Sequence, residues 1–232
     1  MPATQKALES AVDHAAKFIE RLIVVGAVGP GQKLREDEIA KKLNISRSPV
    51  REAMKLLEAR GLVVRSPRKG VFVPPVTKKD IWEIYTLKMV LYTFATRLAA
   101  EKLDGLFLKK LDRIVTKMKK CVERHPPDVL RYQSLNDDFH LTIAVVSGHE
   151  RLRKLIEDLA VQVHRYSYLS LKDHDHLRLS LSYHESILEA LKNRDADKAE
   201  SLTREHIMSG LRFLNDNETF TFKPTSEKEG LL

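Results

Sequence analysis

The sequence predicts a mainly α-helical protein in which an N-terminal winged helix-turn-helix with a small β-ribbon is joined to an all-α bundle of about six helices. Three observations lead to this fold class. Residues 34–73 read as two short helices followed by two β-prone runs. Residues 77–215 are helical in pattern almost throughout, with turn signals at intervals. The adjacent prolines at residues 74–75 predict a stiff connection between the two parts.

These patterns predict two domains and a tail. With 232 residues and a hydrophobic content of 43%, the chain can bury two modest cores. We expect domains at residues 1–75 and 76–217, followed by a polar, disordered tail at residues 218–232.

The N-terminal domain opens with two helices. Apolar residues recur at helical spacing over residues 8–25, and the glycines and proline of residues 26–31 end that helix. A second, shorter helix is expected over Glu36–Leu43. Asn44 tolerates the tight turn that follows, and Ile45 can fill the core behind it.

A third helix and a hairpin complete the domain. Ser46 or Ser48 can cap the third helix, and Gly61 ends it. Two short β-prone runs, Leu62–Arg65 and Gly70–Val73, flank the basic tip Ser-Pro-Arg-Lys. The sequence therefore predicts a two-stranded ribbon after the third helix.

The larger domain begins at a capping box. Thr77 with Asp80 has the spacing of this motif, so a long helix should start there. Further along the chain, turn residues divide the helical pattern into about six helices. We expect the breaks near residues 104–105, 125–127, 147–148, 172–176 and 193–195.

Charge is concentrated at the N-terminal end. The chain carries a formal charge of +8. Residues 1–77 hold 14 Lys+Arg against 8 Asp+Glu, a net of +6, whereas the remaining 155 residues hold 26 against 24, a net of +2. This asymmetry is typical of a polyanion-binding head joined to a sensing or pairing body.

The sequence also limits the class of protein. A single cysteine, Cys121, excludes an internal disulfide framework and a thiolate zinc cluster, and favours a reducing compartment. No secretory signal or long apolar run is visible near the N-terminus. We expect a soluble, cytoplasmic protein with no membrane partner.

Arginines mark the third helix as a recognition helix. Arg47 and Arg51 lie one turn apart on the face opposite the apolar stripe, where they can fork onto guanine or clamp phosphates. Arg68 and Lys69, at the ribbon tip, can reach flanking phosphates or the minor groove. The alternative is a helical hairpin with solvated arginines, and the basic ribbon and the charge asymmetry weigh against it.

The run GAVGPGQKLREDEIAKKLNISRSPVREAMKLLEARGLVVRSPRKGVFV resembles the winged-helix head of GntR-type bacterial transcription regulators. The resemblance implies that Arg35, Ser46, Arg47, Arg51 and Gly70 occupy DNA-contacting or wing-turn positions. With the neighbouring polar residues of the helix and the ribbon, the predicted DNA-binding set is Arg35, Ser46, Arg47, Ser48, Arg51, Arg68, Lys69 and Gly70.

Histidines distinguish the helical domain. Asn136 and His140 lie one turn apart on one helix face, while His184 and His206 occupy inward positions on two other helices. Imidazoles that converge with an oxygen donor inside a bundle suit Zn²⁺ or Ni²⁺. The alternative is a set of purely structural core histidines.

A second resemblance supports the metal site. The segments IYTLKMVLYTFATRLAAEKL, NDDFHLTIAVVSGHERL and SYHESILEALKNRDADKAE, with the following EHI, look like the effector-binding (FCD-type) helical domain of the FadR subgroup. The resemblance implies four metal ligands, which are Asn136, His140, His184 and His206. It also implies a small carboxylate effector.

This chain departs from the family pattern at three positions. Asn136 offers a neutral oxygen where relatives have a carboxylate, and Asp137 points about 100° further around the helix. In the first helix of the domain, Lys88 and Tyr92 stand where relatives have an arginine and a glutamate. Lys88 can meet an anion as a point charge, or it is a snorkelling surface residue, and Arg178 can supply the bidentate contact instead.

Two further histidines receive no role. His174 and His176 alternate in the polar segment KDHDHL, and the family pattern places nothing there. We interpret both as solvent-exposed residues of a loop.

The sequence therefore predicts a homodimeric transcription regulator, a repressor more often than an activator in this family. Two winged heads would bind a pseudo-palindromic operator, and a small organic acid beside a metal ion would control them. A metal-dependent hydrolase is the alternative from another class, although no HExxH spacing or nucleophile supports it. A third hypothesis is a regulator whose histidine cluster is structural.

Overall fold

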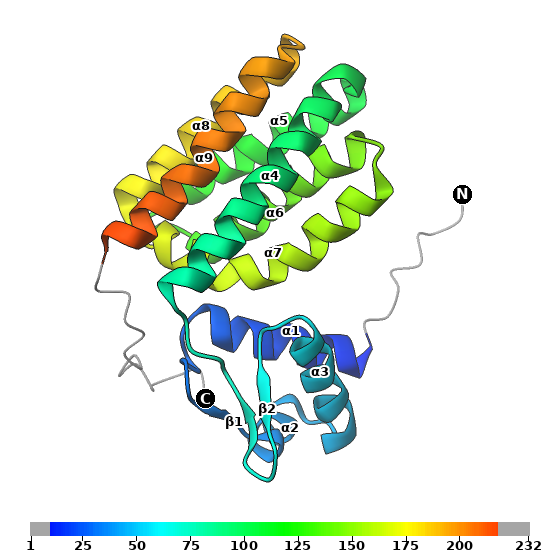
Figure 1. Ribbon diagram of the computed structural model, residues 1–232, viewed down its shortest axis with the longest axis vertical. Coiled ribbons are helices and arrows are strands. Elements are labelled where there is room, and N and C mark those ends of the chain that lie inside the picture. The colour runs from blue at the N-terminus through cyan, green and yellow to red at the C-terminus, as the bar shows by residue number, and fades with distance from the viewer. Residues whose placement is uncertain (1–9, 218–232) are drawn as a thin grey trace. The chain divides into compact units, whose positions relative to one another are not determined.

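The computed structural model describes residues 10–217, and the expected tail at residues 218–232 lies outside them (Figure 1). The chain divides into two compact units between Pro75 and Val76. Helices and one small antiparallel sheet form the first unit, and helices alone form the second.

The first unit is a winged helix-turn-helix. Its three helices enclose a core to which α3 contributes Val50, Met54 and Leu57, all fully buried. Its elements are α1 (Ala11–Val24), β1 (Lys33–Leu34), α2 (Glu36–Leu43), α3 (Arg47–Ala59), β2 (Val64–Ser66) and β3 (Gly70–Phe72).

Local backbone chemistry sets the turns around α3. Asn44 ends α2 in the left-handed conformation with φ 52°, which an asparagine tolerates better than most residues. Gly61 follows α3 with φ 73°, so the glycine lets the chain reverse toward the hairpin. The third helix thus begins and ends close to the predicted positions.

The sheet has one strand more than predicted. Strand β3 lies between β2 and the short strand β1, in the order β1-β3-β2, and both pairings are antiparallel. In this register Leu34 of β1 pairs with Val71 and is buried beside it. A two-residue strand is too short to show an alternating pattern, so the expected two-stranded ribbon is corrected to a three-stranded sheet.

The second unit is a bundle of six helices among residues 76–217, as predicted. Turns separate the helices at the expected breaks, each helix from α5 to α9 starting after an Asp or His cap. The helices are α4 (Lys78–Lys102), α5 (Gly105–Val122), α6 (Val129–Val146), α7 (Glu150–Leu171), α8 (His174–Lys192) and α9 (Ala196–Asp216).

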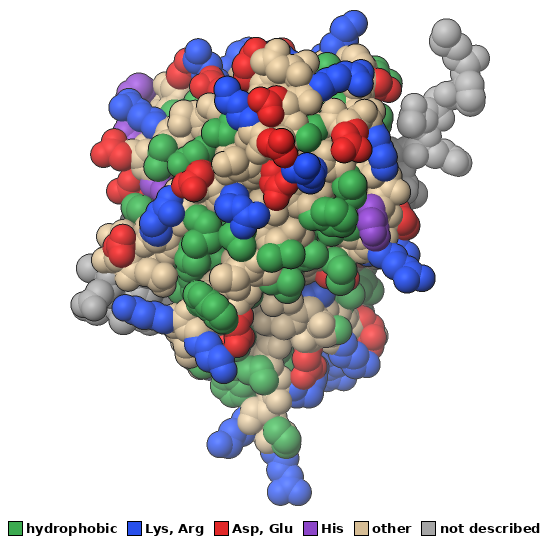
Figure 2. All heavy atoms as spheres, turned by 45° about the horizontal axis from the view of Figure 1, so that its top comes forward, with side chains coloured by type: hydrophobic (Ala, Val, Ile, Leu, Met, Phe, Trp, Pro, Cys, Tyr) green, Lys and Arg blue, Asp and Glu red, His purple; other side chains and the backbone are tan. Residues whose placement is uncertain are grey.

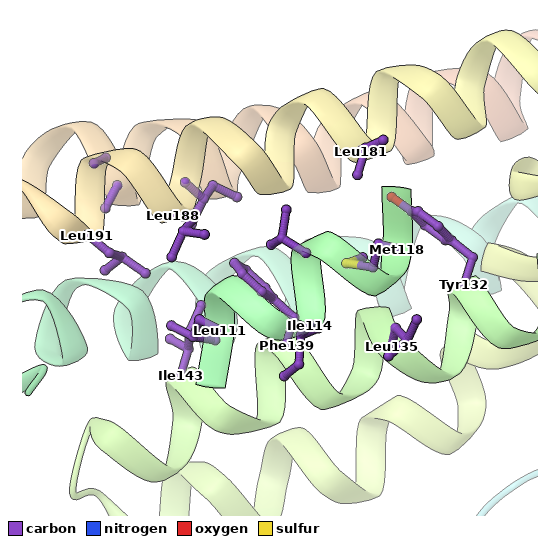
Figure 3. Packing of buried hydrophobic residues seen from close by; sticks show 14 of the residues in the cluster. Leu111, Ile114, Met118, Tyr132, Leu135, Phe139, Ile143, Leu181, Leu188 and Leu191 are labelled. Atoms are coloured by element: carbon purple, nitrogen blue, oxygen red, sulfur yellow. The ribbon is translucent and has the colours of Figure 1, made fainter. Parts of the chain in front are cut away.

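Two apolar clusters fill the bundle. One lies where α5, α6 and α8 meet and includes Met118, Tyr132 and Phe139 (Figure 3). The other lies where α4, α7 and α9 meet and includes Tyr85, Tyr166 and Ile207. The polar centre described below is built from residues of the helices that carry these clusters.

Helix α4 starts at a complete capping box. The backbone N–H of Asp80 donates to Thr77 Oγ1 (3.1 Å), and the backbone N–H of Thr77 donates to Asp80 Oδ2 (2.9 Å). These bonds satisfy two N–H groups that the helix itself leaves free. The predicted start of the helix is therefore confirmed.

Among residues 10–217, no helix combines the length and the apolar composition that crossing a bilayer requires.

Replacing Thr77 with alanine should destabilise the helical unit by about 1 kcal/mol, because the substitution removes one half of the capping box. Urea denaturation followed by the fluorescence of Trp82, the single tryptophan and a residue of α4, measures the change. Thr86→Ala in the same helix is the control, since the Thr86 hydroxyl donates only to the carbonyls of Trp82 and Glu83 within the helix. Equal effects of the two substitutions would contradict the assignment.

Candidate nucleic-acid interface and metal centre

The recognition helix α3 presents an arginine without a protein partner. Arg47 is its first residue and is exposed, and its side chain forms no salt bridge or hydrogen bond with other residues in the range 10–217. Ser46 takes the N-cap position without a side-chain cap bond, and Ser48 is exposed one residue beyond Arg47. Two hydroxyls and a guanidinium therefore stand at the start of the helix, where they can reach a ligand.

Carboxylates hold the next arginines in place. Arg51 Nε donates to Glu36 Oε2 (2.6 Å), which joins α3 to α2 and leaves the two terminal nitrogens of its guanidinium out of that bond. Arg35 Nη1 donates to Glu38 (3.0 Å) within one turn. Both guanidinium groups are exposed, so these ion pairs orient them more than they stabilise the fold.

The hairpin tip carries the remaining predicted cations. Arg68 adopts φ 60°, and the backbone N–H of Lys69 donates to Ser66 O (3.1 Å) to close the turn. Both side chains are exposed, and Figure 2 shows Lys and Arg side chains projecting at the lower end of the view, where Figure 1 places this turn.

Two further cations complete this face. Arg35 and Arg47 line a polar groove of about 390 Å³ together with Lys33 and Arg65, which the sequence did not single out. Lys33 lies on β1, and its Cε would stand only 2.7 Å from a Cβ added at Gly70. Gly70 therefore makes room for Lys33 as well as for the backbone, whose φ is 113°. No sequence pattern reveals Lys33, because β1 is too short to recognise.

In the helical unit, three histidines meet in the core. His140 of α6, His184 of α8 and His206 of α9 are 3%, 0% and 9% exposed. Their ring centroids lie 5.3, 5.5 and 4.5 Å apart, and one candidate ligand atom from each ring lies within 4.8 Å of the others. The convergence predicted from helical spacing is present.

One ring nitrogen of each histidine in this triad lacks a hydrogen-bond partner in the described part of the chain. His140 Nε2, His184 Nε2 and His206 Nδ1 are buried and have no hydrogen-bond partner among the described residues. Leaving one buried polar atom unsatisfied costs about 1–3 kcal/mol, and here three lie together. A divalent ion with nitrogen ligands would satisfy all three, so the residues present fit a metal.

The protonation state of the three imidazole rings also suits a metal. Burial lowers the pKa of His184 to about 4, and burial together with neighbouring imidazoles and Lys88 lowers the pKa of His140 and His206 well below the usual value. Neutral imidazole is the form that binds metal. His184 Nδ1 lies 2.7 Å from Ser180 O, a contact that requires the proton on Nδ1 and leaves the Nε2 lone pair free.

Asn136 lies one turn before His140 and is also buried. Its Nδ2 donates to Asp137 Oδ1 (3.3 Å), which leaves its carbonyl oxygen free for another partner. Asp137 in turn lies 2.9 Å from His164 Nε2 through its other oxygen. The neighbouring carboxylate is thus engaged away from the triad, and Asn136 is the available oxygen donor.

The structure gathers two of the three predicted effector residues. Lys88 is only 5% exposed, and its Nζ lies 5.6 and 5.3 Å from the ring centroids of Tyr85 and Tyr92. Tyr92 contacts His140, with ring centroids 5.0 Å apart. Arg178 is exposed on α8 and does not line the cavity beside the triad. Lys88 is therefore no snorkelling surface residue.

The interpretation of His176 as a solvent-exposed loop residue is wrong. Asp173 caps α8, accepting from the backbone N–H of His176 (2.8 Å), so the helix begins at His174. His174 is exposed, but His176 is only 8% exposed and stacks on Phe213 of α9, with centroids 4.6 Å apart. A residue in the first turn of a helix can face inward, and composition alone did not reveal where that turn begins.

Comparison with protein-family models gives two matches. Residues 11–73 match the model described as bacterial regulatory proteins, gntR family, and residues 83–209 match the FCD domain. The two matched segments correspond to the winged unit and the helical unit described above.

Curated relatives share the same organisation. The gluconate operon transcriptional repressor of Bacillus subtilis (strain 168) is 33% identical over 180 residues, which cover 75% of this chain and 72% of the relative. The HTH-type transcriptional repressor RspR of Escherichia coli (strain K12) is 26% identical over 191 residues, covering 82% and 83%.

Solved structures resemble the fold. The structure described as E. coli McbR/YncC superposes with a TM-score of 0.78 at 25% identity and covers 89% of this chain and 98% of that chain. A GntR-type regulator from Rhodococcus sp. RHA1 gives a TM-score of 0.72 at 20% identity, covering 88% and 97%, and supports the fold alone.

Proposed function

The chain belongs to the gntR family of bacterial regulatory proteins and carries an FCD domain, and on this premise we propose that it is an effector-controlled repressor. It is a DNA-binding transcription regulator and not an enzyme, which removes the metal-dependent hydrolase from consideration. Repression is proposed because relatives at 33% and 26% identity are named repressors. The helical unit is proposed to be of the FadR type.

Operator recognition is assigned to the start of α3 and to the wing. Arg47 inserts into the major groove to meet a base edge, while Arg51, Ser46 and Ser48 fix the helix against phosphates. The support is that Arg47 is exposed and has no protein partner within residues 10–217. Phosphates flanking the groove are assigned to Arg35, Arg68, Lys69 and the turn at Gly70, as well as to Lys33 and Arg65.

The protein is proposed to act as a homodimer. One chain carries one recognition helix, and a second copy related by a two-fold axis would place another on the next half-site. The operator is therefore proposed to be pseudo-palindromic, since its symmetry follows that of the protein.

A divalent ion, Zn²⁺ or Ni²⁺, is proposed to be held by His140, His184 and His206, with Asn136 as the oxygen donor. The observation that carries this proposal is the set of three buried, unsatisfied nitrogens from three separate helices. When bound, the ion supplies a Lewis-acidic contact for an anionic oxygen. The ligand residues themselves tie α6, α8 and α9 together.

A small carboxylate is proposed to bind beside this centre. Lys88 supplies the positive charge, and Tyr92 packs between Lys88 and His140. An effector can change DNA affinity only by binding one conformation of the protein more tightly than another. Because Lys88 and Tyr92 lie on α4, the helix that follows the linker, the effector would act on DNA binding through that helix.

Arg47→Ala should weaken binding to the operator by about 1–3 kcal/mol, the usual contribution of a side chain that reads a base. A titration of operator DNA by fluorescence anisotropy at physiological salt measures this change. Arg113→Ala, which removes the same charge from an exposed position of α5, is the matched control. Unchanged affinity in the Arg47 variant would remove that residue from the interface.

Lys69→Ala should reduce the dependence of log K on log salt concentration by about one unit, because one phosphate contact is lost. The affinity for operator DNA is measured across a salt series for both proteins. Lys110→Ala, an exposed lysine of α5, should leave the slope at the wild-type value. If the Lys69 and Lys110 variants behave alike, the wing does not touch phosphate.

Protein purified without chelators should contain about one equivalent of a first-row divalent metal, or take it up on addition of Zn²⁺ or Ni²⁺. Elemental analysis measures the content, and chelation should lower the melting temperature because the three nitrogens lose their partner. His184→Gln should lose the metal, whereas His174→Gln, at an exposed position of the same helix, should retain it.

Less than a tenth of an equivalent after reconstitution would favour the alternative of a purely structural histidine cluster.

A further inference from the structure

A small chamber with several polar side chains on its wall lies next to the histidine triad. Its volume is about 30 Å³, which corresponds to roughly two water molecules. Residues from five helices line it, among them Lys88 of α4, Asn136 of α6, His176 and Ser180 of α8, and His206 of α9. The chamber therefore shares two walls, Asn136 and His206, with the proposed metal centre.

The wall of the chamber contains a cation but no carboxylate. Lys88 lies on it, more than nine-tenths buried, and its ammonium group has no salt bridge or hydrogen bond to other residues within the described part of the chain. Asp137 is the carboxylate that acts on it from a distance, and it is engaged with His164 and Asn136. A buried ammonium without a counterion is costly, and an anion in the chamber would remove that cost.

His176 supplies a hydrogen-bond donor on the wall of the same chamber. Its ring is held flat against Phe213, while its two ring nitrogens have no hydrogen-bond partner among residues 10–217. Neutral imidazole carries one N–H, so the ring can donate one hydrogen bond to an oxygen. Ser180 adds a hydroxyl, whose oxygen accepts from Tyr132 OH (3.0 Å) and whose proton is free to donate.

We propose that Lys88 and His176 form the recognition pair of this chamber and that its ligand is a compact oxyanion carrying two negative charges. The inference rests on the proposed effector site and specifies its ligand class. The family pattern that suggested the metal ligands assigns nothing to His176, and the assignment comes from its burial and its place on the chamber wall.

Charge balance selects the dianion. A divalent ion and the Lys88 ammonium bring three positive charges, two from the ion and one from the lysine, and Asn136 contributes none of the negative charge that an aspartate would bring. Without Asp137, which lies off the chamber wall, a monoanion would leave a net of two positive charges and a dianion one; with the Asp137 carboxylate counted, the totals are one and zero. The small volume restricts the part of the ligand beside Lys88 to a compact oxyanion group, since a long apolar chain has no space there.

Isothermal titration of the Zn²⁺-loaded full chain at pH 7 tests the ligand class. Malonate and propionate share a three-carbon chain and differ by one carboxylate, and inorganic phosphate is the oxyanion without carbon. Malonate should bind at least tenfold more tightly than propionate. Tighter binding of phosphate than of malonate would support a doubly charged ligand and identify it as phosphate rather than a dicarboxylate. Equal affinities for malonate and propionate, or no binding of any of the three, would overturn the proposal.

Two substitutions test the residues. Lys88→Met removes the charge at constant length, and His176→Phe keeps the ring on Phe213 but removes both nitrogens. Each should weaken binding of the preferred dianion at least tenfold while metal content stays at the wild-type level. Arg178→Met, which removes an exposed cation from the same helix as His176, should bind like the wild type. If either of the first two variants does not fold, Lys88→Gln or His176→Asn replaces it. Wild-type affinity in the His176 variant would overturn its role.

Operator binding separates this inference from the proposed function. In one outcome, dianion binding depends on Lys88 and His176 but does not change operator affinity. This result would contradict effector control and support Lys88 and His176 as the recognition pair. In the opposite outcome, malonate or phosphate changes operator affinity equally in the wild type and in both variants. This result would support effector control and overturn the recognition pair.

Discussion

The helical unit is organised around the burial of polar atoms that its own residues do not satisfy. Three imidazole nitrogens on α6, α8 and α9 lie within 4.8 Å of one another and have no hydrogen-bond partner among residues 10–217, and the buried Lys88 ammonium lies nearby on α4. Each such group costs stability in a chain whose total margin is only about 5–15 kcal/mol. The packing of apolar side chains does not by itself explain why these unsatisfied groups lie together. The two apolar clusters of the bundle contribute the stability that offsets the cost of burying these polar groups.

The two units depend on different physical terms. In the winged unit, exposed arginines are held by Glu36, Glu38 and Glu58, and such surface ion pairs contribute little stability but limit where a guanidinium can be. Affinity for a polyanion in that unit comes from charge close to water and is sensitive to salt. In the helical unit the Lys88 ammonium is buried and weakly screened, so the selectivity of the proposed ligand site would depend on charge balance and cavity size. One chain thus uses both regimes of protein electrostatics.

Much of the architecture could be predicted from local patterns. The capping box at Thr77, the left-handed turn at Asn44 and the Asp and Gly residues between helices each fix a boundary by a local rule, so the nine helices among residues 10–217 lie where the pattern placed them. Strand β1 could not be predicted, because two residues are too few to show the alternation of apolar and polar side chains that marks a strand. Helical spacing also predicted the convergence of His140, His184 and His206. It failed for His176, whose inward direction depends on where α8 begins, and it left Lys88 undecided, because an amphipathic side chain suits either a surface or a core.

Helix α4 contains neither glycine nor proline between Lys78 and Lys102, and its capping box fixes the first turn. The distance along the helix from Thr77 to Lys88 is eleven residues, or roughly 16 Å. The helix therefore lacks the residues at which helices usually kink, so a displacement of one part is not absorbed by a kink. A shift of Lys88 toward the proposed anion would therefore be passed along the helix to Thr77, where the proline-containing linker to the winged unit ends. In the proposed role of Lys88, the residue that recognises the charge of the ligand is also the residue at which ligand binding would displace α4.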